Sequence, residues 1–540
     1  MLYKLPLLKP IWRQISLSAT LPYVSLLAWT IPLLLFSSGE NSVMAHDEGL
    51  YAWRARQMFD VDDWIAPWGN AHHKTPGAYW LIGIFYKLLG ISEFSTRLPN
   101  MILGIFCLLL TYELGKIMLS KKLGWLAATI LSVTFLWLQY CRLGTPDIPT
   151  VFLVLSAIYA FLQAELSPKY RYIWSFIAGL SLSLGFLMRS FMMLLPIIAL
   201  LPYLIVHHRR HRHLANPLLY VGLVVGFIPT LVWLWFNWQR YGNDSFAALF
   251  GFVVQLGSEE RPGNGIIFYL WNIPINAFPW AFFSILGLIL IIRRPIPRYQ
   301  LILIGFPVVL FTELSIFSTR LSHYSLSLYP FIALLAAVGL DWLGRIYQLG
   351  YVKRKPLLQK GNIPQTLSYG CGLLAILLIL ASIVAFAWEE RTYATIGLIL
   401  GVAWLIPPVI WISRYHLGWK FLTAGSWIAG WLIPCWLALA VAGSFGLLSD
   451  YNPAYRTFLQ KPAIASILQT HPIYFVELVG KNAVLLRFYT PIHGKKVETI
   501  AQVPPYNYAW VYKQPTSRIS KQHRVIGSIQ DYKLIQVLPQ

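Results

Sequence analysis

Two acidic residues lie side by side early in the chain, in a sequence with few acids. Asp47 and Glu48 directly follow the first apolar run, and Asp147 follows Pro146 at the start of a later one. A carboxylate in such a loop can act as general base for an acceptor nucleophile. It can equally solvate the loop or cap the next helix, because aspartate is a preferred N-cap residue. All three carboxylates are therefore candidate catalytic groups, and helix capping remains the alternative.

Basic residues accompany these acids in the same loops and in later ones. Several cations gathered with few carboxylates would suit a negatively charged headgroup, because arginine holds phosphate bidentately and lysine holds it as a point charge. Each cation could instead be an interface anchor whose aliphatic stem lies along lipid. Lys74 fits the anchor role least, because two histidines precede it and a Pro-Gly turn follows. The cations concerned are Arg54, Arg56, Lys74, Arg261 and Arg320.

A metal site is the weaker interpretation of the same loop. His72 and His73 could ligate a divalent metal together with Asp47 or Glu48. Adjacent histidines point in different directions in most backbones, however, and no His-x-x-x-His spacing supports a site. We therefore predict no metal and no other cofactor. The four cysteines lack metal-type spacing and lie in or beside apolar segments, which indicates small buried hydrophobes rather than disulfides.

Most of the chain has the composition of a membrane protein. Hydrophobic residues make up 57% of the 540 residues and charged residues only 12%, against roughly 25% charged in soluble domains. Crossing the hydrocarbon core takes about 20 apolar residues, and such runs predict about thirteen transmembrane helices. The runs lie near residues 17–37, 96–118, 123–140, 146–164, 173–188, 190–206, 217–237, 272–292, 299–316, 324–343, 368–388, 393–413 and 420–445.

The distribution of basic residues predicts the orientation. The net charge of +22 could suit a nucleic-acid binder, but the bases form short clusters between apolar runs, as topology signals do. The basic clusters lie in the N-terminal tail and in every second connection after it. Because loops rich in lysine and arginine face the cytoplasm, the N-terminus is predicted to be cytoplasmic, and an odd number of helices then places the C-terminus outside. Val43-Met44-Ala45 resembles a signal-peptidase site. The apolar run before it is longer than a usual signal core, so we expect an uncleaved anchor.

Two domains are expected. Residues 1–449 form the transmembrane domain, with long outer loops at 38–95 and 238–271. The first loop contains an amphipathic helix and a short apolar patch of the interfacial kind. Residues 450–540 form a soluble extracytoplasmic α/β domain, in which a helix-like stretch precedes short β-like runs. These segments are helix-like Pro453 to Leu468 and strand-like Ile473 to Leu478, Ala483 to Tyr489, Tyr508 to Tyr512 and Tyr532 to Leu538.

Short motifs in a fixed order carry a family resemblance. The first loop reads Asp47-Glu48-Gly-Leu-Tyr51-Ala-Trp-Arg54-Ala-Arg56-Gln-Met58, then Asp63-Trp64-Ile-Ala-Pro67 and Lys74-Thr-Pro76-Gly77-Ala-Tyr79-Trp80. Later motifs are Arg97-Leu98-Pro99, Pro146-Asp147, Phe278-Pro279-Trp280 and Arg320-Leu321-Ser322-His323-Tyr324. Over about residues 20–345 this order resembles polyprenyl-phosphate-sugar glycosyltransferases of the C-type fold. These enzymes form the protein O-mannosyltransferase superfamily, and the likeness is greatest to its lipid A aminoarabinose transferase branch.

The resemblance implies an inverting transfer of sugar from a polyprenyl monophosphate, such as undecaprenyl phosphate, at the outer face of the bacterial inner membrane. The acceptor would be a lipid A-like glycolipid, a glycan or a protein, as in protein mannosylation. By motif position Asp47, flanked by Glu48, resembles the general base, and Asp147 lies where the family often keeps an acid. The expected donor-phosphate residues are Lys74, Arg54, Arg261, Arg320 and Tyr324. The chain departs from the family's Lys-Pro at Thr75 and has His73 where an acidic or aromatic residue is usual.

Two other classes of function stay open. A transporter or lipid flippase would place ionisable residues inside its helices, and Glu113 and Glu313 are the notable acids in such positions. A catalytically inactive relative that serves as an assembly subunit is the third possibility. A transporter would move substrate into vesicles without consuming a lipid-linked sugar.

Overall fold

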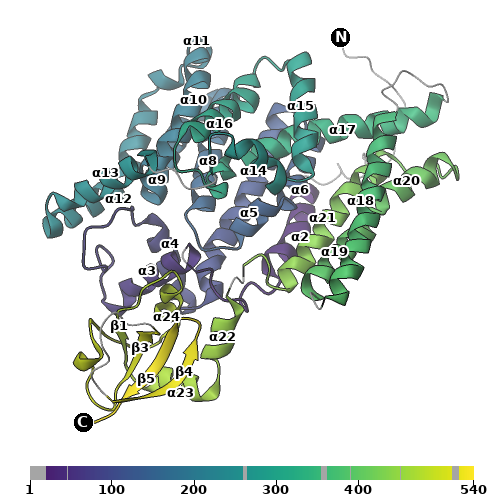
Figure 1. The fold of residues 1–540 in the computed structure, drawn as a ribbon. Coiled ribbons are helices and arrows are strands. Elements are labelled where there is room, and N and C mark those ends of the chain that lie inside the picture. The colour runs from purple at the N-terminus through teal and green to yellow at the C-terminus, as the bar shows by residue number, and fades with distance from the viewer. Residues whose placement is uncertain are drawn as a thin grey trace.

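A bundle of helices makes up most of the molecule (Figure 1). The computed structural model describes residues 20–45, 47–258, 264–353, 362–388, 391–449, 452–513 and 522–539. The longer helices are α2 (Leu21–Leu35), α3 (Glu48–Asp60), α4 (Gly77–Leu89), α5 (Glu93–Met118), α6 (Lys121–Ser132), α8 (Asp147–Leu166), α9 (Arg171–Arg189), α10 (Leu194–Val206), α12 (Pro217–Tyr241), α13 (Asp244–Ser258), α15 (Trp280–Arg293), α16 (Phe306–Ile316), α17 (Tyr329–Lys353), α18 (Asn362–Ala387), α19 (Arg391–Trp404), α20 (Ile406–Tyr415) and α21 (Ala424–Ser444).

Shorter segments connect these helices: α7 (Phe135–Cys141), η2 (Ser190–Met193), α14 (Phe268–Asn276) and η5 (Ser322–Leu328). In the described residues eight helical segments are long and apolar enough to cross a membrane, or up to ten if each of two bent pairs is one span. Pro168–Val206 counts once in that number, and Leu21–Leu35 and Leu301–Ile316 are shorter apolar helices. The polytopic membrane fold is thereby confirmed, while the count of thirteen spans stays a prediction. All four cysteines are free and buried, as expected.

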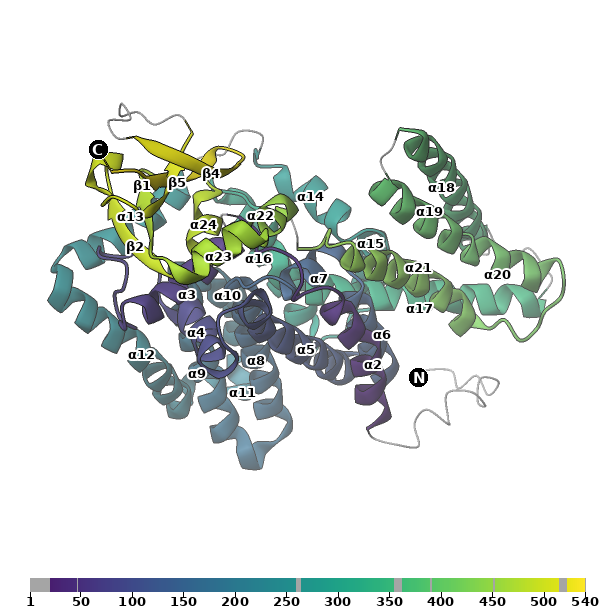
Figure 2. The ribbon, with the colours of Figure 1, turned by 90° about the horizontal axis from the view of Figure 1, so that it is seen from below.

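The C-terminal residues form a five-stranded sheet in the order β2-β1-β3-β5-β4. Strand β1 (Ile473–Val476) pairs in parallel with β2 (His493–Val497) and β3 (Tyr508–Tyr512), while β5 (Tyr532–Val537) pairs antiparallel with β3 and β4 (His523–Ile529). Side chains alternate across it, so that Trp510 and Leu534 face one apolar cluster and Val511 and Ile535 another. Both views place this layer at one end of the bundle, next to α3 and α4 (Figures 1 and 2).

Two expectations for these residues are corrected. The stretch Ala483–Tyr489 is helix α24 rather than a strand, because its apolar side chains pack against α3 instead of alternating between the two faces of a sheet. The expected single helix is two, α22 (Pro453–Leu459) and α23 (Pro462–Thr470), since Pro462 cannot continue the preceding helix. The strands β2 and β4 were not expected at all.

The first outer loop and the C-terminal sheet share one hydrophobic core. Ala52, Ala55 and Met58 of α3 are fully buried in the same cluster as Trp510 and Leu485. A Cβ on Gly49 would lie 2.9 Å from the Met44 carbonyl oxygen, so this turn of α3 accepts no larger residue without a shift. Helix α3 lies in the first loop, where an amphipathic helix was predicted, and its buried face is covered by the C-terminal residues.

Candidate active site

A cavity of about 700 Å³ lies where the first loop, the ends of several apolar helices and α24 meet. Seven separate segments of the chain line it, and both acidic and basic residues are among them. Its titratable lining residues are Asp47, Tyr51, Arg54, His73, Lys74, Tyr140, Asp147, Arg189, His323, Tyr324, Lys481 and Arg487. The structure therefore brings together five of the eight residues predicted for the site: Asp47, Arg54, Lys74, Asp147 and Tyr324.

Asp47 immediately precedes α3 and lines the cavity. Its side chain is exposed and makes no capping hydrogen bond to the helix. Within the described residues, no hydrogen bond or ion pair engages its carboxylate. The helix-cap alternative is therefore wrong for this residue, and the carboxylate is available to accept a proton.

Lys74 belongs to a loop that is fastened to the end of α9. The Thr75 hydroxyl donates a hydrogen bond to the Phe186 carbonyl oxygen at 3.1 Å. A Cβ on Gly77 would lie 2.5 Å from the Leu187 carbonyl oxygen, so glycine permits α4 to begin directly against α9. These contacts hold the lysine beside Arg189, the last residue of α9.

The ammonium group of Lys74 is held without an acidic partner among the described residues. It donates a hydrogen bond to the Tyr51 hydroxyl at 3.1 Å and lies 4.9 Å from the centroid of that ring. Burial above all, together with the charges of Arg54 and Arg189, lowers the pKa of Lys74. Burial also lowers the pKa of His73 to about 4, so this histidine is neutral at pH 7. The charge of Lys74 is therefore available to bind an anion in the cavity.

Asp147, by contrast, is already paired. Its carboxylate is buried and forms an ion pair with the guanidinium group of Arg189. That guanidinium also lies 4.9 Å from the centroid of the Tyr324 ring, and His323 Nδ1 lies 2.9 Å from the Tyr140 hydroxyl. The geometry suits Asp147 for orienting Arg189 toward the cavity rather than for removing a proton.

Three cations in this cavity were not predicted from the sequence. Arg189 lies between the apolar runs 173–188 and 190–206, and a lone arginine at that position is a usable signal in the sequence. Lys481 and Arg487 come from the C-terminal residues. The guanidinium of Arg487 lies 4.9 Å from the centroid of the Trp53 ring. Their position depends on how α24 packs against α3, for which the sequence offered no local sign.

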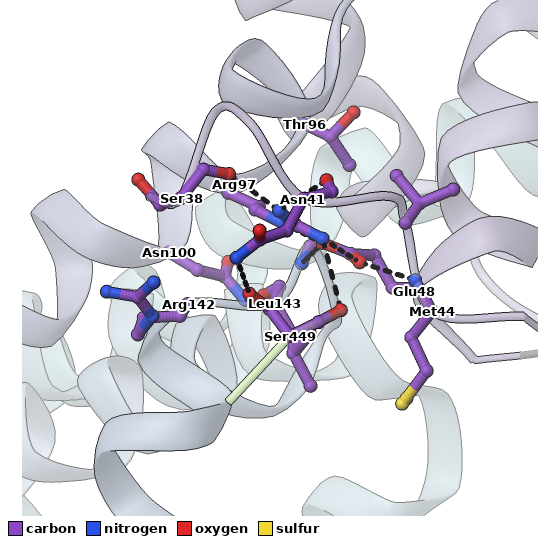
Figure 3. A network of polar contacts seen from close by, with 12 residues as sticks. Ser38, Asn41, Met44, Glu48, Thr96, Arg97, Asn100, Arg142, Leu143 and Ser449 are labelled. Carbon is purple, nitrogen blue, oxygen red and sulfur yellow. Dashed lines mark hydrogen bonds and ion pairs between the residues drawn. The ribbon is translucent and has the colours of Figure 1, made fainter. Parts of the chain in front are cut away.

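Glu48 does not line the cavity, and its placement corrects the prediction that it belongs to the catalytic group. Figure 3 shows it in a buried network with Arg97. The guanidinium donates to both carboxylate oxygens at 2.7 and 2.9 Å, and to the carbonyl oxygens of Ser38 and Ser42 at 2.6 and 2.8 Å. The carboxylate also accepts from the Gly144 amide at 3.1 Å. The pair joins the loop before Asp47 to the loop before Asp147.

The other predicted arginines differ in outcome. Arg320 is buried outside the cavity lining and donates to the carbonyl oxygens of Asn264 and Ser315 at 2.8 and 2.9 Å. These hydrogen bonds hold Asn264 in place. The predicted Arg261 lies outside the described residues. Arg54 lines the cavity and donates to the Tyr79 hydroxyl at 3.2 Å. Of the donor-phosphate set, Arg320 is therefore misassigned to direct contact.

The described part of the chain holds no cluster of metal-ligating side chains. No three histidine, cysteine, aspartate or glutamate side chains gather there in an arrangement that could hold a metal ion. Glu113, which a transporter would use inside the membrane, forms an ion pair with Lys116 at 2.8 Å and lies outside the cavity lining.

Comparison with known proteins gives consistent matches. Residues 73–236 match the protein family described as dolichyl-phosphate-mannose-protein mannosyltransferase. The chain is 25% identical over 322 residues to an uncharacterized protein of Aquifex aeolicus, a match that covers 57% of this chain and 62% of the relative. It is also 25% identical over 444 residues to the undecaprenyl phosphate-alpha-4-amino-4-deoxy-L-arabinose arabinosyl transferase of Pectobacterium atrosepticum, covering 77% of this chain and 74% of that enzyme.

The fold has a close counterpart among solved structures. The crystal structure of ArnT from Cupriavidus metallidurans bound to undecaprenyl phosphate superposes with a TM-score of 0.71 at 18% identity. The superposition covers 96% of this chain and 98% of that one. At this identity the likeness establishes the arrangement of the helices and leaves the individual side chains to be argued from their own contacts.

Proposed function

We propose that this chain, a membrane glycosyltransferase of the superfamily indicated by its sequence motifs and by the comparisons, transfers a sugar from a polyprenyl-monophosphate donor to an acceptor. The acceptor would be a lipid A-like glycolipid, a glycan or a protein. The transfer would take place at the outer face of the bacterial inner membrane, with the N-terminus in the cytoplasm and the C-terminal α/β domain outside. The curated arabinosyl transferase relative and the undecaprenyl phosphate bound by ArnT support this class of donor.

One observation carries the proposal: a single cavity holds an unpaired carboxylate and several cations that lack acidic partners in the described residues. The charge of Arg189 is neutralised by Asp147. The remaining charged side chains of the lining are one carboxylate, Asp47, and four cations, which are Lys74, Arg54, Lys481 and Arg487. This excess of positive charge suits a lipid phosphate, because fixed cations stabilise the negative charge that develops on a leaving phosphate.

The chemistry requires no general acid. The acceptor nucleophile attacks the anomeric carbon while Asp47 removes its proton, and the bond between that carbon and the phosphate oxygen breaks. The polyprenyl phosphate leaves as an anion, stabilised by Lys74 and the neighbouring guanidinium groups. Attack from the side opposite the leaving group inverts the anomeric centre. Tyr51, which receives the Lys74 hydrogen bond, keeps the ammonium group oriented.

Removing the cation at the donor phosphate should weaken donor binding. Lys74→Ala is expected to lower the affinity for undecaprenyl phosphate about 10- to 100-fold, because a charge-assisted hydrogen bond contributes roughly 1.5–3 kcal/mol. Binding to the purified full chain in lipid nanodiscs measures this. Lys87→Ala, at an exposed lysine of α4 outside the cavity, is the matched control. Equal affinities for Lys74→Ala and the wild type would contradict the assignment.

The lowered pKa of Lys74 predicts a pH dependence of donor binding. A bound phosphate raises this pKa again, so between the two values the complex holds one more proton than the free chain. Affinity is therefore constant below the pKa of the free chain and falls as the pH rises through it, starting below about 10.4, the usual value for lysine. Lys74→Arg should abolish the decline, because arginine keeps its charge. Titrating undecaprenyl phosphate affinity from about pH 8 to about pH 10.4 tests this; parallel declines in both proteins would refute it.

A further inference from the structure

Helix α24 contributes part of the wall of the main cavity. It packs against α3 (Figure 1) and brings Val484 and Arg487 into the cavity lining. The guanidinium group of Arg487 lies over the ring of Trp53, which lines the same cavity. The position of this cation relative to the proposed donor phosphate therefore depends on how the C-terminal end of α24 is held against α3.

Two side chains of α3 hold this end of α24 by contacts that stay constant around neutral pH. The centroid of the Trp53 ring lies 4.9 Å from the Arg487 guanidinium. One turn further along α3, Arg56 donates hydrogen bonds to the carbonyl oxygens of Phe488 and Pro491 at 2.6 and 2.7 Å. Arginine keeps its charge at these pH values, so neither contact changes when a histidine nearby titrates.

His493, at the start of β2, makes a third contact that does depend on pH. Its Nε2 lies 2.8 Å from the Arg487 carbonyl oxygen, and its Nδ1 lies 3.1 Å from Oδ2 of Asp60 on α3. A carbonyl oxygen and a carboxylate only accept hydrogen bonds, so both ring nitrogens must carry a proton for both bonds to form. Aspartic acid is a stronger acid than imidazolium, which places the shared proton on the ring. These two contacts, the His493 bridge, therefore require a positively charged histidine.

The groups next to His493 among the described residues come from three other elements. On α3, Oδ2 of Asp60 also lies 3.6 Å from Nε of Arg56. On α24, the backbone of Arg487 faces the ring, while its guanidinium lies over a tryptophan of α3. On β1, the uncharged ring of Phe475 lies 5.1 Å from the imidazole, centroid to centroid. The side chains of His493 and Asp60 are 20% and 26% exposed, so protons from the solvent reach the pair.

We propose that the His493 bridge is a pH-responsive contact that positions Arg487 at the wall of the main cavity. A histidine gains and loses its second proton between about pH 5 and pH 8. The bridge is complete below this range. It weakens as the pH rises through the range, because a neutral ring has one N–H and cannot donate to both the Arg487 carbonyl oxygen and the Asp60 carboxylate. The consequence for donor binding rests on the proposed function, whereas the bridge itself does not.

The test separates the charge of the bridge from its shape. His493→Lys keeps a cation through this pH range and can donate to both acceptors, whereas His493→Gln can donate to the Arg487 carbonyl oxygen but stays uncharged. Asp60→Asn offers a neutral ring a donor for Nδ1, so its bridge forms at either end of the range. His471→Gln, at an exposed histidine just before β1 and outside the cavity lining, is the matched control.

Amide hydrogen exchange of residues 483–489 measures how firmly α24 is held. The full chain in lipid nanodiscs is followed by mass spectrometry from about pH 5 to pH 8, and protection is expressed relative to an unstructured chain at each pH. Melting temperatures verify that each variant is folded.

Protection of α24 in the wild type, divided by that in His493→Lys at the same pH, should fall about fivefold across this range, the upper limit for a partly exposed ion pair. His471→Gln should follow the wild type. His493→Gln should give a low ratio at every pH, and Asp60→Asn should show no decline. A constant wild-type ratio, or a decline of equal size in His493→Gln and Asp60→Asn, would overturn the bridge.

Donor affinity tests whether the bridge controls the site. The phosphate of undecaprenyl phosphate itself loses a proton near about pH 6, so the affinity of the wild type is divided by that of His493→Lys at each pH. We expect this ratio to fall with the protection of α24 and by no more than the same factor. A constant affinity ratio beside falling protection would overturn the control of donor binding. Lys74→Ala with normal undecaprenyl phosphate affinity would instead refute the proposed phosphate site and leave the exchange result standing.

Discussion

Asp47→Asn is expected to reduce sugar transfer by about two to four orders of magnitude, the range over which a general base accelerates a proton transfer. The amide keeps the size and polarity of the side chain but cannot accept the acceptor's proton. Because Asp47 forms no hydrogen bond or ion pair within the described residues, its replacement should leave the melting temperature unchanged. Turnover of a radiolabelled lipid-linked sugar by the purified protein measures the loss.

Two controls give this result its meaning. Asp62→Asn changes an exposed carboxylate of the same loop and should transfer sugar like the wild type. Asp147→Asn removes the partner of Arg189 and should weaken donor binding more than it slows the transfer step. If Asp147→Asn abolished transfer while Asp47→Asn kept it, the roles of the two carboxylates would be exchanged. Undiminished transfer in Asp47→Asn with an intact Lys74 phosphate site would refute Asp47 as the base.

The sequence predicted the parts of this site that are carried by local order along the chain. Asp47 and Lys74 belong to one loop, and the succession of short motifs around them predicted a likeness to polyprenyl-phosphate-sugar glycosyltransferases, with which the matches to known proteins agree. The membrane fold could also be predicted, because the length and apolarity of each run are enough to indicate a membrane-spanning helix. The place of Arg487 in the cavity was not predicted, because it depends on the packing of α24 against α3. The sequence analysis predicted a strand instead of α24.

Glu48 shows why neighbours in sequence need not share a function. It stands next to Asp47, and the two acids appeared to form one pair. Helix α3 begins at Glu48, and successive positions at a helix start point about 100° apart, since one turn takes 3.6 residues. Asp47 therefore faces the cavity, whereas Glu48 faces Arg97 inside the protein. Only the position of α5 beneath the loop decides this, and no short motif encodes it.

The buried pair of Glu48 and Arg97 should govern stability more strongly than any other ion pair considered above. Both side chains are fully buried. Arg97→Met should lower the free energy of unfolding by about 3–5 kcal/mol, because it leaves the Glu48 carboxylate buried without a countercharge. Arg345→Met is the matched control: Arg345 is largely exposed, and its partner Asp341 retains Lys122. It should cost less than about 1 kcal/mol. Melting temperatures followed by tryptophan fluorescence in detergent compare the variants.

The double variant separates charge from packing. Replacing Glu48 by Met in addition to Arg97→Met removes the stranded carboxylate, so it should recover part of the melting temperature lost by the single variant. Sugar transfer should be lost in the single variant and should stay lost in the double variant. Arg97 donates to the Ser42 carbonyl oxygen before Asp47, and Glu48 accepts from the Gly144 amide before Asp147, and the double variant lacks both hydrogen bonds. A double variant that regained full activity would show that these loops hold their places without the pair. We therefore expect the double variant to regain melting temperature without regaining sugar transfer. The charge of Glu48 affects the stability of the folded state, whereas its hydrogen bonds set the distance between Asp47 and Asp147.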